Sequence, residues 1–436
     1  MDLQGLRKFI PTSPKLHKKV AVRGHSGAMK NEPHLQVERI SNARPALNIA
    51  VVTETYPPDI NGVAHTLSKI VQGLQARGHV IWLVRPRQPG ADVATVNSSY
   101  QEVLVRGLPI PFYKQLRLGL PAKRELLRLW SRQRPDIVHI ATEGPLGWSA
   151  LQVARKLKLP ISTDFRTNFH DYSQHYGIGW LRGAILAYMK KFHNAAHATM
   201  VPTAQLEVEL AGSGFKRLSV VPRGIDTGLF SPTQRSTALR QSWGVGEQDR
   251  VMIYVGRLAA EKNLGAVIQS YRGLKQQYPD IKLVLVGDGP MRNELQETHS
   301  DIIFAGFRVG SDLAQHYASA DLFMFASKTE TFGNVTIEAM ASGLAVVAFR
   351  HAAAGELIES GINGMLADPA NDHSFEAAAQ ALLHNPALTR SVGQQAWHTA
   401  NTLGWPTVVE KTETVFQKIL LEHGTPYSHQ WLLQGA

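Results

Sequence analysis

The chain has 436 residues, 44% of them hydrophobic, which predicts two or three folded domains of ordinary size. It contains no cysteine, which excludes disulfides, thiolate metal sites and a cysteine nucleophile. No apolar run reaches the roughly eighteen residues that a membrane helix needs, and no secretory pattern opens the chain. We therefore expect a soluble, cytoplasmic protein that does not span a membrane.

The formal net charge of +11 is unevenly distributed along the chain. Residues 1–45 hold nine Lys or Arg against three acids, and the block from Arg106 to Arg134 holds eight basic residues and one acid. Such blocks attract anionic surfaces, either lipid headgroups or nucleic acid. A solvated helix face whose Leu126, Leu127 and Trp130 pack on a sheet explains the second block equally well.

In chain order, residues 1–45 are polar, basic and aperiodic, which predicts a mostly disordered extension. A strand at Leu47–Thr53, a helix at Ala64–Arg77 and a strand at Val80–Val84 then form a βαβ unit. The first half continues with four more predicted strands, at Ile137–Ile140, Ile161–Asp164, Ala198–Val201 and Ser219–Val221.

The same pattern returns in the second half, with a strand at Arg250–Gly256, a helix at Leu264–Gln277 and a strand at Lys282–Gly287. Later strands are predicted at Ile302–Ala305, Leu322–Ala326 and Ala345–Ala348. A helix over Trp405–Leu421 closes the folded part, and Gln430–Ala436 reads as a loose tail.

These elements predict an α/β protein with two Rossmann-like, doubly wound parallel-sheet domains that face a central crevice. We place the basic extension at residues 1–45, the N-terminal domain at 46–222, the C-terminal domain at 223–405 and a final helix and tail at 406–436. Ligands of such sheets sit beyond the carboxyl ends of the strands, so the loops after Val52 and Val255 are where chemistry is expected.

The segment from Glu330 to Glu338 suits a nucleotide sugar. A turn at Gly333-Asn334 leaves backbone N–H groups of a helix N-terminus free for a diphosphate, and each carboxylate accepts hydrogen bonds from sugar or ribose hydroxyls. The alternative is that both acids are solvated residues flanking an ordinary helix start.

Two cations follow the strand that ends near Val255, namely Arg257 and Lys262. Placed there, they neutralise the charge that develops on a leaving diphosphate. In the first half, Gly62 follows a strand and opens a helix, so its backbone can approach a phosphate closely. A plain surface loop is an equally good interpretation of the two cations considered alone.

Several other sites are excluded by their spacing. The glycine pairs at 287–289 and 212–214 begin like a dinucleotide fingerprint, but arginine stands where the third glycine belongs. No Asp-x-Asp pair occurs, and His170 and His175 lack metal-ligand spacing and a third partner, so no metal is predicted. The chain has no phosphate-binding loop of the ATPase type.

Five motifs together resemble glycosyltransferase family 4: Asn61-Gly62-Val63, Arg223-Gly224-Ile225-Asp226, Gly256-Arg257 with Lys262, Gly287-Asp288-Gly289-Pro290, and Glu330 through Glu338. The resemblance runs from about Leu47 to Leu421. It implies a GT-B fold, retention of anomeric configuration, and a nucleotide-diphosphate sugar as co-substrate with no metal or other cofactor. It is strongest for bacterial members that glycosylate lipids or envelope glycans from GDP-mannose or UDP-hexoses such as UDP-glucose.

The resemblance also implies roles for individual residues. Gly62, Arg257 and Lys262 would hold the diphosphate, and Glu330 would contact the sugar hydroxyls. Donor contacts would further come from Phe332, Gly333, Asn334, Val335 and, at the ribose, Glu338. We count Arg257, Lys262 and Glu330 as the catalytic set.

One departure from the family concerns the segment Phe165-Arg166-Thr167-Asn168, where Arg166 occupies the place of the usual active-site histidine. His170, four residues later, is only a weak substitute. We hypothesise that Arg166 still faces the sugar or phosphate, and we place His170 and Asp226 with it on the sugar and acceptor side.

The sequence thus predicts a retaining hexosyltransferase that moves a mannose- or glucose-type sugar to a hydroxyl of a lipid or envelope glycan. We expect peripheral attachment to the anionic inner face of the cell membrane through residues 1–45 and 106–134, and no nucleic-acid partner. Three alternatives stay open: a nucleotide-sugar epimerase, a phosphorylase of the same fold, and a membrane-surface binding protein with a decayed site.

Overall fold

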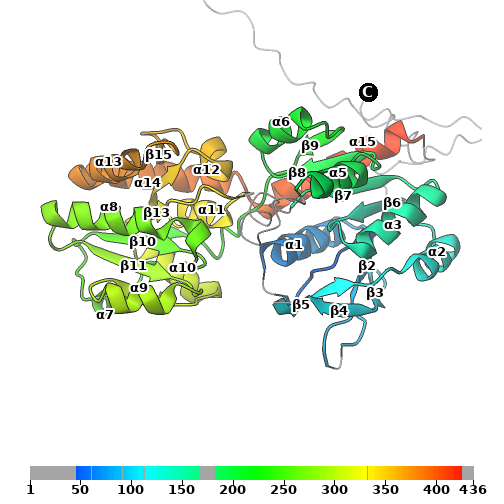
Figure 1. The fold of residues 1–436 in the computed structure, drawn as a ribbon, viewed down its shortest axis with the longest axis horizontal. Coiled ribbons are helices and arrows are strands. Elements are labelled where there is room, and N and C mark those ends of the chain that lie inside the picture. The colour runs from blue at the N-terminus through cyan, green and yellow to red at the C-terminus, as the bar shows by residue number, and fades with distance from the viewer. Residues whose placement is uncertain are drawn as a thin grey trace, which may run out of the picture. The chain divides into compact units, whose positions relative to one another are not determined.

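The computed structural model describes most of the chain, namely residues 46–59, 61–90, 92–110, 113–166, 182–330 and 332–424. The predicted extension at 1–45 and the tail at Gln430–Ala436 lie outside the described residues. Two parallel sheets, each covered by helices, make up the described part (Figure 1). The predicted doubly wound α/β architecture is therefore confirmed.

The first sheet has the order β3-β2-β1-β6-β7-β8-β9, and every neighbouring pair is parallel. Its strands are β1 (Asn48–Val52), β2 (Val80–Pro86), β3 (Tyr100–Val105), β6 (Ile137–Ile140), β7 (Ile161–Asp164), β8 (Ala198–Val201) and β9 (Leu218–Val220). The order reverses between β1 and β6, which is where such sheets bind ligands.

Both faces of this sheet are buried, which explains why β1 is apolar from Ile49 to Val52. Ile49 and Val51 face one core together with helices α1 (Gly62–Ala76) and α15 (Trp405–Glu422). The alternate residues of β1 face a second core under other helices. The other helices described beside this sheet are α2 (Lys123–Arg132), α3 (Pro145–Lys156), α5 (Arg182–His193) and α6 (Ala204–Gly212).

The second sheet has the order β12-β11-β10-β13-β14-β15, again entirely parallel. Its strands are β10 (Val251–Val255), β11 (Lys282–Val286), β12 (Ile303–Gly306), β13 (Leu322–Phe325), β14 (Ala345–Phe349) and β15 (Met365–Ala367). Its helices are α7 (Thr237–Ser242), α8 (Leu264–Gln277), α9 (Arg292–Thr298), α10 (Gly310–Ala318), α11 (Asn334–Ala341), α12 (Ala352–Leu357), α13 (Asp372–His384) and α14 (Pro386–Asn401). Short 3-10 turns occur at Pro232–Gln234 and Ala260–Lys262.

The predicted strands and the final helix are all present, with ends shifted by a residue or two. The sequence did not reveal β3, β15 or the antiparallel hairpin of β4 (Gly107–Ile110) and β5 (Tyr113–Gly119). β3 lies at a sheet edge and carries Glu102, which pairs with Arg85 of β2, so it lacks the apolar run of an inner strand.

The chain passes between the two sheets twice, once after β9 and once before α15, and these two segments contact each other. The Ile225 N–H donates to the Leu403 carbonyl at 3.0 Å, which joins the segment that leaves the first sheet to the one that returns to it. A Cβ at Gly224 would lie 2.7 Å from the Trp405 indole, so only glycine fits there. The segment after β9 is thereby packed against the start of α15.

Helix α15 stabilises the first sheet through its buried face. Phe416 is 0% exposed in the core that contains β1 and α1. We expect Phe416→Ala to reduce the free energy of unfolding of this part by about 3–5 kcal/mol, because it removes a ring and leaves a cavity. Denaturant unfolding followed by circular dichroism measures the loss. Lys418→Ala, at an exposed position of the same helix, should change the midpoint little, and equal effects of the two variants would contradict this packing.

Candidate active site

The candidate site is built where the order of the second sheet reverses. Strands β10 and β13 are neighbours there, and both loops that leave their carboxyl ends carry residues singled out by the sequence. The loop after β10 carries Arg257 and Lys262, and the loop after β13 carries Glu330. Parallel neighbours end at the same edge of a sheet, so these two loops lie at the same edge.

Glycines let a third loop support the first. A Cβ at Gly287 would lie 1.9 Å from the Gly256 carbonyl oxygen, and one at Gly289 would lie 2.4 Å from the Leu258 carbonyl oxygen. The Leu258 N–H donates to the Asp288 carbonyl at 2.9 Å. The glycine pair that fails as a dinucleotide fingerprint therefore serves a close backbone contact that holds the loop of Arg257 and Lys262.

Lys262 and Glu330 form an ion pair across the two loops, with Nζ 2.6 Å from Oε1, and both side chains are partly exposed. Arg257 pairs with Glu261 four residues later, and the Tyr254 hydroxyl donates to the Arg257 carbonyl at 3.1 Å. The site therefore holds two cations and two carboxylates within a short stretch of the sheet edge. Among the described residues, no group of three or more His, Cys, Asp or Glu forms a metal cluster.

The loop of Glu330 is fastened to the start of helix α12. His351 Nε2 lies 3.2 Å from the Glu330 backbone nitrogen and 3.0 Å from its carbonyl oxygen. The Ala353 N–H donates to the Phe332 carbonyl at 2.8 Å. His351 and the α12 backbone thus fix the backbone on both sides of Thr331, which itself lies outside the described residues.

Helix α11 begins at Asn334, as predicted, directly after Gly333. Gly333 has φ +87°, a left-handed conformation that glycine adopts without strain. Among the described residues, no side chain caps this end of α11, and no acidic residue lies in its first turn. Its first backbone N–H groups are therefore available to an anion at the positive end of the helix dipole.

Glu338 lies one turn into α11 and bonds to a buried tyrosine. The Tyr317 hydroxyl, from α10, donates to Glu338 Oε2 at 2.9 Å, and Tyr317 is 0% exposed. Burial raises the pKa of Glu338 to about 7, and the tyrosine hydrogen bond lowers it in part. The tyrosine thus holds one carboxylate oxygen in place, while the other oxygen can still accept a hydrogen bond from a hydroxyl of a ligand.

The first sheet contributes the start of α1. Asn61 caps that helix by accepting hydrogen bonds from the N–H groups of Val63 and Ala64 at 3.1 and 2.9 Å. Gly62 follows it, and a Cβ there would lie 3.4 Å from Nη1 of Arg223 and 3.5 Å from Nδ2 of Asn334. The starts of α1 and α11 therefore lie close together, as the assignment of both to one ligand requires.

The residues placed on the sugar and acceptor side have varied surroundings. Arg166 is buried and pairs with Asp164, with Nη2 2.5 Å from Oδ2. Asp226 pairs with Lys69 of α1 at 3.2 Å and accepts a hydrogen bond from a backbone N–H of its own turn. His170 lies outside the described residues.

Two residues of the site carry no signal in the sequence, namely Tyr317 and His351. Arg223 belongs to one of the sequence motifs, but the motif did not predict its contact with Asn334. Tyr317 and His351 each contact a motif residue 21 positions away along the chain. A single sequence shows no periodicity that links such pairs. Only the parallel sheet brings them together.

The Tyr317 hydrogen bond predicts a change in the ionisation of Glu338. We expect Tyr317→Phe to raise the pKa of Glu338 above about 7, because the variant removes a donor that favours the carboxylate. The titration of ¹³C-labelled glutamate side chains by NMR measures it, and Glu338→Gln identifies the resonance. Tyr271→Phe, whose hydroxyl contacts Asp301 instead, is the matched control. An unchanged Glu338 pKa in Tyr317→Phe would refute this role of the hydroxyl.

Comparisons with known proteins agree with this geometry. The family "Glycosyltransferase Family 4" matches residues 60–229, and "Glycosyl transferases group 1" matches residues 235–398. A GDP-mannose-dependent alpha-mannosyltransferase of Corynebacterium glutamicum is 32% identical over 86% of this chain and 88% of its own length. An alpha-monoglucosyldiacylglycerol synthase of Streptococcus pneumoniae is 27% identical over 78% of this chain and 80% of its own length.

Among solved structures, the sucrose-phosphate synthase of Thermosynechococcus elongatus superposes with a TM-score of 0.68 at 18% identity, over 86% of this chain and 99% of that one. At this identity the likeness concerns the fold, and it agrees with the GT-B architecture of two parallel sheets. The two family matches, together with the 32% identity to the mannosyltransferase over most of both chains, show that the chain belongs to the group 1 and family 4 glycosyltransferases.

Proposed function

We propose that the chain transfers a hexosyl group, of mannose or glucose type, from a nucleotide-diphosphate sugar to a hydroxyl of a lipid or envelope-glycan acceptor. The observation that carries the proposal is the ion pair of Lys262 and Glu330 beside the uncapped start of α11. This pair places two groups at one sheet edge: a cation that can stabilise the leaving group, and a carboxylate that can accept hydrogen bonds from the sugar hydroxyls. Relatives named as mannosyltransferases and glucosyldiacylglycerol synthases support the same chemistry.

In this proposal the diphosphate lies between the starts of α1 and α11, held by the backbone at Gly62 and by Arg257 and Lys262. Glu330 accepts hydrogen bonds from hydroxyls of the sugar. The backbone from Phe332 to Val335 contacts the sugar and the phosphate, and Glu338 accepts a bond from the ribose. The protein needs no divalent metal, because fixed cations and helix dipoles neutralise the diphosphate.

The reaction breaks the bond between the anomeric carbon and the phosphate oxygen, and its electron pair stays on the leaving diphosphate. The acceptor oxygen forms the new bond from the face that the diphosphate leaves, so anomeric configuration is retained. The acceptor proton passes to the departing phosphate oxygen. The protein then supplies positioning and charge stabilisation, with no nucleophile of its own.

The proposal is tested first at the donor. Titration of GDP, UDP and ADP by calorimetry in EDTA should show tight binding of one nucleotide, weakened in Glu338→Gln. With the matching sugar nucleotide and a diacylglycerol or glycolipid acceptor, Lys262→Met should turn over roughly a hundredfold more slowly, because it removes a charge that stabilises the leaving group. Lys418→Met, at an exposed position of α15, should behave as the wild type.

Each alternative function predicts a different product. Conversion of the sugar nucleotide without acceptor would indicate an epimerase, and a requirement for free phosphate would indicate a phosphorylase. Binding of no nucleotide at all, or unchanged turnover in Lys262→Met, would overturn the proposal.

We further propose that the first domain attaches to anionic membrane through α2. Lys123, Arg124, Arg128 and Arg132 are exposed along this helix, while Leu126 and Trp130 are buried against the sheet. The sequence left two interpretations of these cations open, an anion-binding patch and the solvated face of a packed helix. The two are compatible, because one face of α2 packs on the sheet while the opposite face can contact lipid headgroups. Among the described residues, no helix is both long and apolar enough to cross a membrane. A contribution from residues 1–45 belongs to the same proposal.

Sedimentation with vesicles that contain phosphatidylglycerol tests this attachment. We expect binding at low salt, loss at high salt, and roughly thirtyfold weaker partitioning of the double variant Arg124→Gln/Arg128→Gln, since each surface cation contributes about 1 kcal/mol. The double variant Lys411→Gln/Lys418→Gln on α15 changes the net charge equally and should bind as the wild type. Absence of binding at low salt would defeat the proposal.

A further inference from the structure

Four arginines are buried in the described part of the chain: Arg85, Arg166, Arg223 and Arg240. Burial of a guanidinium is costly unless a carboxylate and hydrogen bonds compensate it. Three of the four are compensated in this way. Arg85 pairs with Asp92 and Glu102, Arg166 with Asp164, and Arg240 with Asp321. Arg223 is the exception among the described residues.

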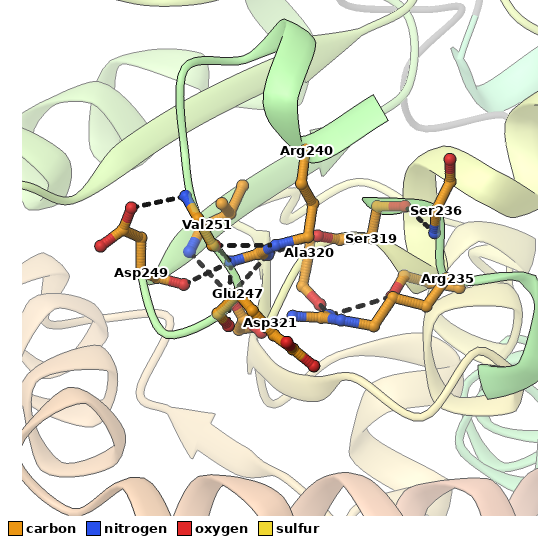
Figure 2. A network of polar contacts seen from close by, with 11 residues as sticks. Arg235, Ser236, Arg240, Glu247, Asp249, Val251, Ser319, Ala320 and Asp321 are labelled. Carbon is orange, nitrogen blue, oxygen red and sulfur yellow. Dashed lines mark hydrogen bonds and ion pairs between the residues drawn. The ribbon is translucent and has the colours of Figure 1, made fainter. Parts of the chain in front are cut away.

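Arg240 shows how a structural arginine is accommodated in this protein (Figure 2). Its Nη1 lies 3.3 Å from the Asp321 carboxylate and 2.7 Å from the Ser319 carbonyl. Its Nη2 donates to the carbonyls of Gly246 and Asp249 at 2.7 and 2.6 Å. The guanidinium is surrounded by acceptors, and its role is to join α7 to the start of β13.

Arg223 has different surroundings. It is 8% exposed, yet its only hydrogen bond to another described side chain runs from Nη1 to the neutral Asn334 Oδ1, at 3.3 Å. Its Nε is buried and has no hydrogen-bond partner among the described residues. Its guanidinium carbon lies 5.8 Å from the centre of the Phe332 ring, a weak cation–π contact. The positive charge is thus left without a carboxylate.

The acids near Arg223 are committed to other cations. Asp164 accepts a hydrogen bond from the Arg166 guanidinium, and Glu330 accepts one from the Lys262 ammonium group. Burial and the neighbouring Arg166 charge lower the pKa of Arg223 to about 10, while Asp164 and Glu330 act in the opposite direction. The guanidinium remains protonated at neutral pH, and it lacks a counter-charge.

The positive ends of two helices face the same place. Nη1 of Arg223 lies 3.4 Å from where a Gly62 Cβ would be, at the start of α1, and it contacts Asn334, the first residue of α11. Helix starts and a buried guanidinium repel one another electrostatically and together favour an anion with several oxygens. A phosphate group has that charge and number of acceptors.

We propose that Arg223 binds a phosphate group of a substrate between the starts of α1 and α11, as a third cation beside Arg257 and Lys262. This proposal rests on the proposed glycosyl transfer and deepens it. The phosphate comes either from the diphosphate of the sugar donor or from a phosphate carried by the lipid acceptor. Because Arg223 lies on the segment that leaves the first sheet, the bound phosphate also joins that segment to both helices.

The test uses Arg223→Met, which keeps much of the volume and removes the charge. Loss of an uncompensated buried charge should leave the melting temperature of the free protein unchanged or raised. Arg240→Met is the matched control, and it should melt at a lower temperature because it removes one cation from Asp321 and leaves several buried carbonyls without this donor. A fall in the melting temperature of Arg223→Met as large as that of Arg240→Met would indicate a structural arginine and overturn the proposal.

Binding separates the two sources of phosphate. For a donor phosphate, Arg223→Met should weaken binding of the preferred nucleoside diphosphate by about tenfold or more, the effect of a charged hydrogen bond, and leave the monophosphate unaffected. For an acceptor phosphate, diphosphate binding stays unchanged, and KM rises for a phosphate-bearing lipid acceptor but not for a phosphate-free glycolipid. Diphosphate affinity and both KM values within twofold of the wild type would overturn the proposal while leaving glycosyl transfer intact.

A further measurement keeps this inference separate from the proposed function. If the wild type binds no nucleotide, the proposed function fails, and inorganic pyrophosphate then serves as the probe. A rise in melting temperature with pyrophosphate that disappears in Arg223→Met would support the phosphate site on its own. No rise in the wild type would overturn it.

Discussion

Close packing of backbone against backbone at the carboxyl edge of the second sheet is the constraint on which the site depends. Gly287 and Gly289 leave no room for a side chain against Gly256 and Leu258, so the loop after β11 supports the loop after β10 directly. That support places Lys262 within 2.6 Å of Glu330 on the neighbouring strand's loop. A side chain at either glycine would push the loops apart and separate the pair.

The charges of the site are balanced unequally before any ligand binds. Lys262 already has Glu330, and Arg166 already has Asp164, whereas the hydrogen-bond partner of the Arg223 side chain among the described residues is the neutral Asn334. In the proposed reaction a diphosphate would draw Lys262 toward itself and free Glu330 for the hydroxyls of the sugar. In the free protein, Lys262 and Glu330 therefore pair with each other, and each would exchange this partner for a group of the donor when the donor binds.

The segment that leaves the first sheet carries part of this charge and joins the two sheets. It carries Arg223 and Asp226, packs Gly224 on Trp405, and bonds Ile225 to the returning chain at Leu403. We propose that the hinge of domain closure lies in the segment at 223–232 and at the start of α15, because these two segments join the two sheets of an enzyme that closes on its donor. Phosphate binding at Arg223 would then act on the hinge itself.

The apolar runs of the sequence predicted most strands of both sheets, because parallel strands that are covered on both faces are mostly apolar, as Val251–Val255 is. Motif order also located Lys262, Glu330 and the start of α11, since strand ends and helix starts are local features. Tertiary structure alone decided the Tyr317–Glu338 bond, the support of Glu330 by His351 and the burial of the Arg223 charge, whose contact with Asn334 spans 111 positions. Such contacts depend on which strands become neighbours, and local periodicity contains no information about pairs so far apart.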